Sequence, residues 1–188
     1  MSDALQDLET ELNAATDRAR QLVDGAEPRL FTVRPHMSSW SAAECIAHLN
    51  TTSELFVPIL EDSIEAARKS GVTTTRAPRM DVVGALLRWF MEPPVRVKTK
   101  TAAPFVPRGV RAKAESLAEF VSVQNQILDL IHSAHDLDLR KLKIVSPFDK
   151  RIKYNVYSAF RILVAHQRRH LWQAEQAIGA LRQAQMVA

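Results

Sequence analysis

Apolar residues recur at intervals of three and four along most of the chain, which is the spacing of one face of an α-helix. The clearest runs predict long helices over about residues 3–24, 41–70, 116–134 and 154–183, and a shorter apolar helix over 81–91. No stretch of useful length alternates between apolar and polar residues, as a half-buried strand would. The pattern therefore predicts an all-α protein, a four-helix bundle whose long connections allow crossovers.

Two connections in this bundle are long. Gly25 and Pro28 are expected to end the first helix, and residues 29–39 to form a loop. The second connection, residues 71–116, contains a Pro-rich basic stretch at about 92–112. Its basic residues make it a candidate for holding an anionic cofactor, although a solvated loop is the simpler interpretation. The candidates for that role are Arg96, Lys98 and Lys100.

The start of the second long helix is unusually well marked. Ser41 and Glu44 have the spacing of a capping box, in which each side chain bonds the backbone amide of the other residue. Trp40 precedes the cap and is expected to pack on Cys45 as a hydrophobic staple. Pro58 lies inside the same helix and is expected to kink it.

Length and composition limit the class of protein. A chain of 188 residues suits one domain, residues 1–188, and few glycines favour helices. One cysteine excludes an internal disulfide. Because the chain has neither a signal-peptide pattern nor an apolar run of about 18 residues, we expect a cytoplasmic protein without a membrane partner. The net charge of +4 is modest, and no motif points to nucleic acid.

Three histidines are the strongest candidates for chemistry. His166 and His170 are four residues apart in a predicted helix, so their imidazoles lie on one face, about 6 Å apart, and can converge on one metal ion. His48, in a second amphipathic helix, could supply a third nitrogen. Three imidazoles leave a coordination position open, as in catalytic metal sites. The alternative is that all three are core histidines bonded to protein groups, with no metal.

Other polar residues on these helices are candidates for supporting the histidines. Gln173 follows His170 by three residues and faces the same side, and Gln124 interrupts the apolar stripe of the third long helix. Glu44 and Thr52 share the side of His48. Each could instead be an ordinary structural hydrogen-bonding group. No catalytic residue is identified, because Gln167 stands where a helical zinc peptidase has its glutamate.

The remaining reactive side chains carry less information. Cys45 reads as a small buried side chain at the staple position, not as a nucleophile. His132 and His135 are expected at the surface near the end of the third long helix, and His36 in a loop. The sequence has no phosphate-binding glycine loop, no dinucleotide fingerprint and no paired Glu-x-x-His motifs of a di-iron bundle.

Two motifs resemble a known family. Residues 40–49, Trp-Ser-Ala-Ala-Glu-Cys-Ile-Ala-His-Leu, resemble the second-helix signature of the DinB/YfiT-like superfamily. Residues 165–173, Ala-His-Gln-Arg-Arg-His-Leu-Trp-Gln, look like its closing helix, and the resemblance spans roughly residues 5–181. It implies a DinB-type bundle, often a homodimer, in which His48, His166 and His170 hold a divalent metal ion.

The resemblance also implies classes of activity. Characterised relatives include S-transferases that use mycothiol or bacillithiol and an isomerase that uses mycothiol. We therefore expect a metal-dependent S-transferase or hydrolase acting on an electrophilic small molecule, with nickel or zinc, or else iron or manganese, and with a low-molecular-weight thiol as a further cofactor. The alternative is a non-catalytic metal-binding or interaction module built on the same bundle.

Overall fold

The computed structural model describes residues 2–94, 101–107 and 109–187, and of Val187 only the backbone. The proposed cofactor-binding residues Arg96, Lys98 and Lys100 lie outside the described residues. Among the described residues, no helix is both long and apolar enough to cross a membrane.

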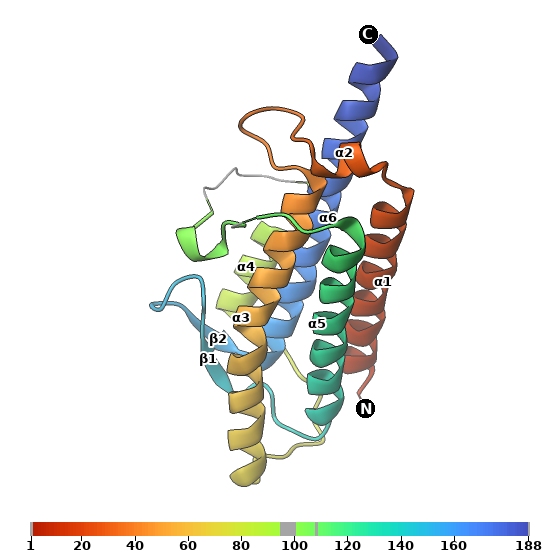
Figure 1. The fold of residues 1–188 in the computed structure, drawn as a ribbon. Helices are drawn as coiled ribbons and strands as arrows, with labels where there is room; N and C mark the ends of the chain where they lie inside the picture. Colours follow the sequence, from red (N-terminus) through yellow and green to blue (C-terminus); the bar gives the residue numbers. More distant parts are fainter. Residues whose placement is uncertain (1, 95–100, 108, 188) are drawn as a thin grey trace.

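Four long helices form the bundle, as the periodicity predicts. They are α1 (Asp3–Gly25), α3 (Ala42–Lys69), α5 (Lys113–Ser133) and α6 (Val156–Val187). Each of α1 and α3 packs against both α5 and α6. Helices α1 and α6 run in one direction and α3 and α5 in the other, so the connection from α3 to α5 must return along the length of the bundle (Figure 1). This connection is the expected long crossover.

The helix boundaries follow local signals. Helix α3 begins with the predicted capping box, in which the Glu44 amide donates to Ser41 Oγ (3.2 Å) and the Ser41 amide donates to Glu44 Oε2 (2.9 Å). The helix then continues through Pro58 to Lys69. A proline inside a helix loses one backbone hydrogen bond, because it has no amide hydrogen, and its ring crowds the preceding turn. Packing of α3 against α5 and α6 can offset this cost.

Shorter elements lie between the long helices. They are α2 (Pro28–Thr32), α4 (Val82–Met91), a 3₁₀ turn η1 (Ala103–Phe105) and the strands β1 (Lys143–Val145) and β2 (Lys153–Asn155). The strands pair antiparallel, with Ile144 opposite Tyr154. Helix α4 packs on α6, where Gly84 lies against Ser158, and it exposes Val82 and Leu86 on its outer face.

Two features differ from the sequence-based expectation. Pro28 does not simply close α1 but occupies the first turn of α2, where its missing amide costs nothing. The stretch before α6, where the sequence pattern predicts neither helix nor strand, contains the β1–β2 hairpin. Strands of three residues are too short to show periodicity, so only pairing across the turn reveals them.

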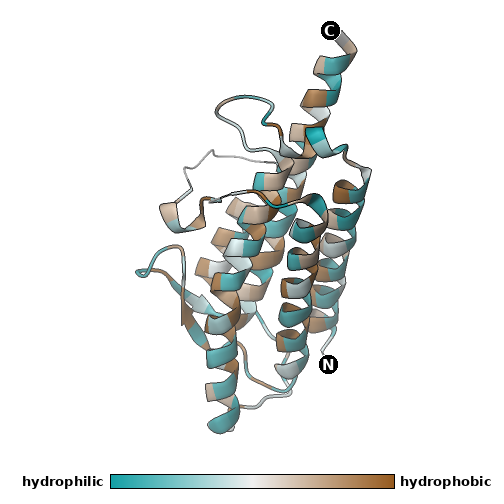
Figure 2. Ribbon diagram, in the orientation of Figure 1, coloured by the Kyte–Doolittle hydropathy of each residue, from teal (hydrophilic) through white to brown (hydrophobic). Residues whose placement is uncertain are grey.

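The core consists of two apolar clusters with buried polar residues where they meet. The helices carry hydrophobic and hydrophilic positions along their length (Figure 2), and the buried positions are mostly apolar. On α6 one cluster ends at Val164 and the other begins at Leu171. All four long helices contribute to the polar layer at this level, which comprises Thr16, His48, Thr52, Gln124, His166, Gln167 and His170.

Candidate metal centre

The three candidate histidines meet between α3 and α6. His48, His166 and His170 are 3%, 4% and 8% exposed, so all three imidazoles are buried. Their ligand nitrogens all lie within 4.8 Å of one another, and Nε2 of His48 is 3.1 Å from Nε2 of His166. The ring centroids are 4.4–5.0 Å apart. Facing nitrogen atoms at this spacing can bind a divalent metal ion, because imidazole is a favoured ligand of such ions.

A backbone carbonyl orients one of the three rings. Nδ1 of His48 is 2.6 Å from the carbonyl oxygen of Phe105, a distance that fits donation by Nδ1–H. With its proton on Nδ1, His48 presents a lone pair on Nε2 to the cluster, which is the tautomer that a metal ligand needs. Phe105 belongs to η1, 57 residues along the chain from His48, and no sequence signal identifies a carbonyl for this role.

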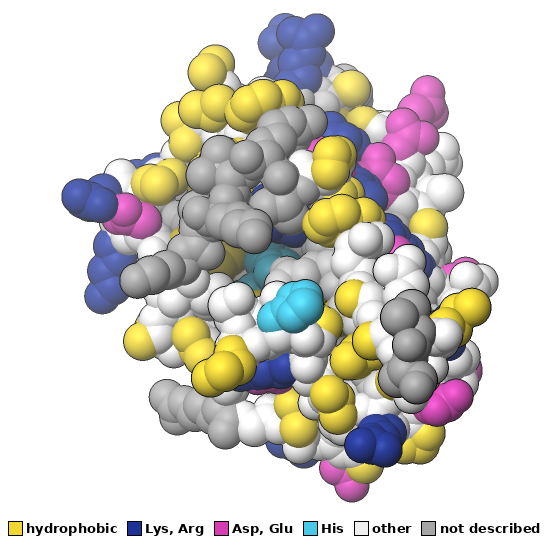
Figure 3. Space-filling model, turned by 90° about the horizontal axis from the view of Figure 1, so that it is seen from above, with side chains coloured by type: hydrophobic (Ala, Val, Ile, Leu, Met, Phe, Trp, Pro, Cys, Tyr) yellow, Lys and Arg dark blue, Asp and Glu magenta, His cyan; other side chains and the backbone are white. Residues whose placement is uncertain are grey.

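Aromatic side chains from three connections surround the histidines. The Trp40 ring lies 4.9 Å from His48 and 5.9 Å from His170, so Trp40 covers the site as well as packing on the apolar cluster that contains Cys45. Phe148, in the β1–β2 turn, lies 5.9 Å from His166 and 4.6 Å from Phe105. The end-on view shows histidine side chains near the middle of this face (Figure 3), but the three clustered histidines are at most 8% exposed and contribute little surface.

Burial keeps the imidazoles neutral. Loss of hydration lowers the pKa of His166 and His170 well below the ordinary value, and the charges of neighbouring histidines and Arg169 lower it further. Burial also lowers the pKa of His48, against the opposing effect of the Phe105 carbonyl. Neutral imidazoles are the form that binds metal, so the site is competent at neutral pH without having to lose protons.

These shifts predict acid sensitivity of the metal-free protein. In the unfolded chain these histidines bind protons once the pH falls below about 6.5. In the folded chain their pKa values are lower, so they stay neutral at that pH. The free energy of unfolding therefore decreases as the pH falls from about 6.5 to the lowered pKa values. Denaturant unfolding with chelator at pH 7.0 and 5.5 should show a lower free energy of unfolding at pH 5.5. Each histidine contributes up to about 1.4 kcal/mol per pH unit.

The matched control for this prediction is a pair of variants. His166→Gln should reduce the pH dependence, whereas His36→Ala, at an exposed position, should leave it unchanged. Stability that stays level or rises on acidification would show that the histidines are not buried in neutral form.

The supporting candidates occupy different positions. Gln173 lies beside His170 and acts to raise the pKa of that ring. Gln124 exchanges hydrogen bonds with Gln167 at 2.6 and 3.2 Å and donates to Thr16, so its amide joins α1, α5 and α6. Thr52 is fully buried, one turn after His48.

Glu44 serves the start of α3. Besides its capping bonds, it accepts from Arg34 Nε at 2.7 Å, and this guanidinium is the main reason that the pKa of Glu44 is lowered. Among the described residues, the groups of histidine, cysteine and acidic side chains close enough to hold an ion comprise only the three histidines. No fourth ligand of these types therefore closes the site within the described ranges.

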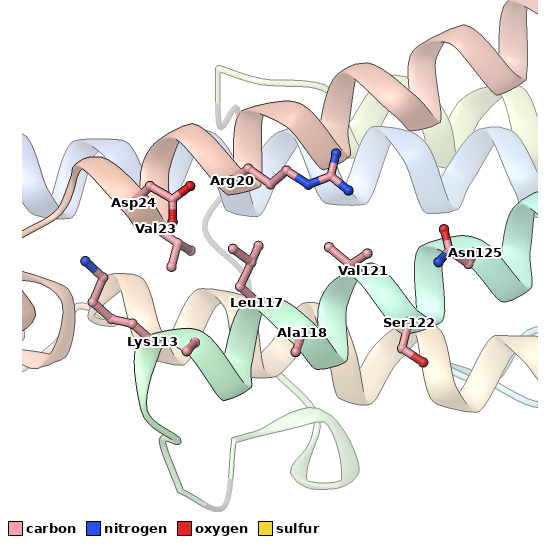
Figure 4. A pocket seen from close by; sticks show the side chains of 10 residues that line it. Arg20, Val23, Asp24, Lys113, Leu117, Ala118, Val121, Ser122 and Asn125 are labelled. Atoms are coloured by element: carbon pink, nitrogen blue, oxygen red, sulfur yellow. The ribbon is translucent and has the colours of Figure 1, made fainter.

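Other reactive side chains lie apart from the cluster. Cys45 is buried, and burial raises the pKa of its thiol, which agrees with an unreactive packing role. His36, His132 and His135 are exposed, as expected. A shallow groove lies between α1 and α5, lined by Val23, Leu117 and Val121 with charged side chains at its edges (Figure 4). It is on a different helix pair from the histidines.

Comparison with known proteins agrees with the geometry. A family model described as the DinB superfamily matches residues 11–174, most of the chain, and the match includes all three histidines. The chain therefore belongs to the DinB superfamily. Neither a search of curated protein sequences nor a search of solved structures yields a match.

Proposed function

We propose that this DinB-superfamily protein is a metalloenzyme that holds a divalent ion on His48, His166 and His170 and acts on an electrophilic small molecule. The observation that carries the proposal is the convergence of three buried, neutral imidazoles with no fourth histidine, cysteine or acidic ligand among the described residues. A closed structural site would have a fourth protein ligand, whereas a catalytic site keeps a position for substrate. Nickel and zinc both suit three imidazoles.

The fit of the residues to an ion rests on the placement of their nitrogen atoms. Nε2 of His48 and Nε2 of His166 face each other at 3.1 Å, and Nδ1 of His48 has its partner in the Phe105 carbonyl. Neutral imidazoles that face one another in this way can direct their lone pairs to one ion. When bound, the ion would supply Lewis-acid chemistry, which lowers the pKa of a thiol or water molecule that it binds.

The residues around the cluster favour thiol transfer or hydrolysis over peptide cleavage. The residue between the two α6 histidines at the peptidase glutamate position is Gln167, whose amide is bonded to Gln124. The described residues therefore offer no carboxylate at that position to act as general base. The aromatic side chains of Trp40, Phe105 and Phe148 exclude water and favour a small substrate with an apolar part.

The proposed S-transfer is a substitution. The thiol sulfur bonds to the electrophilic carbon, the leaving group departs with the electron pair of its bond to that carbon, and the thiol proton passes to solvent. In hydrolysis a water molecule takes the place of the thiol. A low-molecular-weight thiol is thus a co-substrate in the first reaction and unnecessary in the second.

The test is turnover of a thiol and a chromogenic aryl halide by nickel- or zinc-loaded protein. We expect a rate above that of the uncatalysed mixture, reduced more than about 100-fold in His48→Ala, because loss of a metal ligand exceeds the usual 10–100-fold effect of an outer-shell change. The exposed His132→Ala variant is the control and should retain full activity. An unchanged rate in folded His48→Ala would remove the site from the reaction.

A non-catalytic metal module is the second candidate, and the low exposure of the cluster favours it. The histidines are at most 8% exposed, and Trp40 covers two of them. An ion in such a site could serve stability or partner binding without substrate access. If a small anion binds to the metal ion and changes the visible spectrum of that metal, the site is accessible. If the spectrum does not change, the site is sealed.

A further inference from the structure

The two halves of the polar layer differ in their hydrogen bonding. In the half formed by Thr16, Gln124 and Gln167, donors and acceptors are matched at 2.6–3.2 Å. In the histidine half, Thr52 is 0% exposed, and its Oγ1 has no hydrogen-bond partner among the described residues. A buried hydroxyl without a partner is destabilising, so its retention calls for an explanation.

Two threonines on α1 use their hydroxyl within the helix. Thr10 donates to the Gln6 carbonyl at 2.9 Å, and Thr16 donates to the Leu12 carbonyl at 3.1 Å. This bond to the carbonyl four residues earlier is the usual way for a helix to satisfy a threonine. Thr52 lies well inside α3 and does not make it, so its hydroxyl is available to another partner.

Thr52 lies one helical turn from the candidate ligand His48, on the same face of α3. Residues four apart on a helix lie on one face, which places Thr52 between His48 and Phe56. His48 reaches the His166 ring at 5.0 Å, and Phe56 reaches Phe148 at 5.5 Å, which in turn lies 5.9 Å from His166. Thr52 thus lies on the face of α3 whose neighbouring side chains are His48, which contacts His166, and Phe56, which contacts Phe148.

We propose that the Thr52 hydroxyl binds the substrate by donating a hydrogen bond to a small anionic ligand at the position that the three histidines leave open. A thiolate is such a ligand. This inference rests on the proposed metal centre and adds to it a group that selects for negative charge. It also explains why a hydroxyl that the fold does not use is kept in the core.

The test measures anion binding to cobalt(II)-loaded protein, with azide as the probe and the visible spectrum of cobalt as the readout. Thr52→Val keeps the shape of the side chain without the hydroxyl, and Thr52→Ser keeps the hydroxyl. We expect the azide dissociation constant to rise about tenfold or more in Thr52→Val and to stay within about twofold in Thr52→Ser, with cobalt affinity unchanged in both.

Thermal unfolding of the metal-free protein provides a second readout. Thr52→Val should leave the melting temperature unchanged or raise it, because no hydrogen bond in the protein is lost. The matched variant Thr16→Val removes a hydroxyl that is bonded to Leu12 and Gln124 and should lower it. A fall in Thr52→Val equal to that in Thr16→Val would show that a protein group uses the Thr52 hydroxyl, and would overturn the proposal.

The outcomes separate this inference from the proposed function. Cobalt uptake with equal azide constants in wild type and Thr52→Val would overturn the role of Thr52 alone. Cobalt uptake with no spectral response to azide in any variant would overturn both the open position and the role of Thr52. Absence of cobalt uptake would overturn the metal centre, and the Thr52 proposal with it.

Discussion

Protein purified without an affinity tag should contain about one divalent ion per chain, and His166→Ala should contain none. The Nε2 atoms of His166 and His48 are 3.1 Å apart, and loss of His166 would leave only His48 on α3 and His170 on α6 to hold the ion. We expect metal affinity to fall more than about 100-fold, beyond the usual effect of an outer-shell change. Elemental mass spectrometry of the two proteins, before and after reconstitution with nickel and zinc, measures this.

The control for this prediction is His132→Ala. His132 is exposed and lies near Glu9 (3.3 Å), away from the cluster, so its loss should not change the metal content. If wild type binds no metal even after reconstitution, the three imidazoles are core residues joined by the His48–His166 contact. Equal metal content in wild type and His166→Ala would place the ion elsewhere in the chain.

Gly84→Ala should destabilise the protein by about 1–3 kcal/mol, the usual range for overpacking. A Cβ atom at Gly84 would lie 2.2 Å from both Cβ and Oγ of Ser158, so α4 would have to move away from α6. That movement would disturb the start of α4, where Asp81 accepts from the Gly84 amide and Ser158 Oγ accepts from the Asp81 amide. Denaturant or thermal unfolding measures the loss.

Gly179→Ala is the matched control. Gly179 lies within α6, where an added Cβ meets no atom within 4 Å, so alanine should stabilise the protein by about 0.5–1 kcal/mol through its better helix propensity. Adding Ser158→Gly to Gly84→Ala should recover part of the loss, because both clashing atoms are removed. Destabilisation of equal size in the two glycine variants would show that the α4–α6 contact is not the cause.

The architecture was largely predictable because periodicity is a local property. The predicted helix at residues 3–24 corresponds to Asp3–Gly25, and the one at 41–70 to Ala42–Lys69. The start of α3 was predictable to the residue, since a capping box involves only side chains and amides three positions apart. The hairpin before α6 was not, because its pairing joins residues across a turn and leaves no pattern in three-residue strands.

The sequence by itself determined the all-α bundle and the three histidines, since helical spacing puts His166 and His170 on one face whatever surrounds them. Only the tertiary structure decided what meets them. The Phe105 carbonyl, the rings of Trp40 and Phe148 and the unused hydroxyl of Thr52 reach the site through connections and packing. Every residue has a backbone carbonyl, so the sequence does not mark the one at Phe105. Whether the Thr52 hydroxyl is buried without a hydrogen-bond partner depends on how the helices pack, which the sequence does not show either.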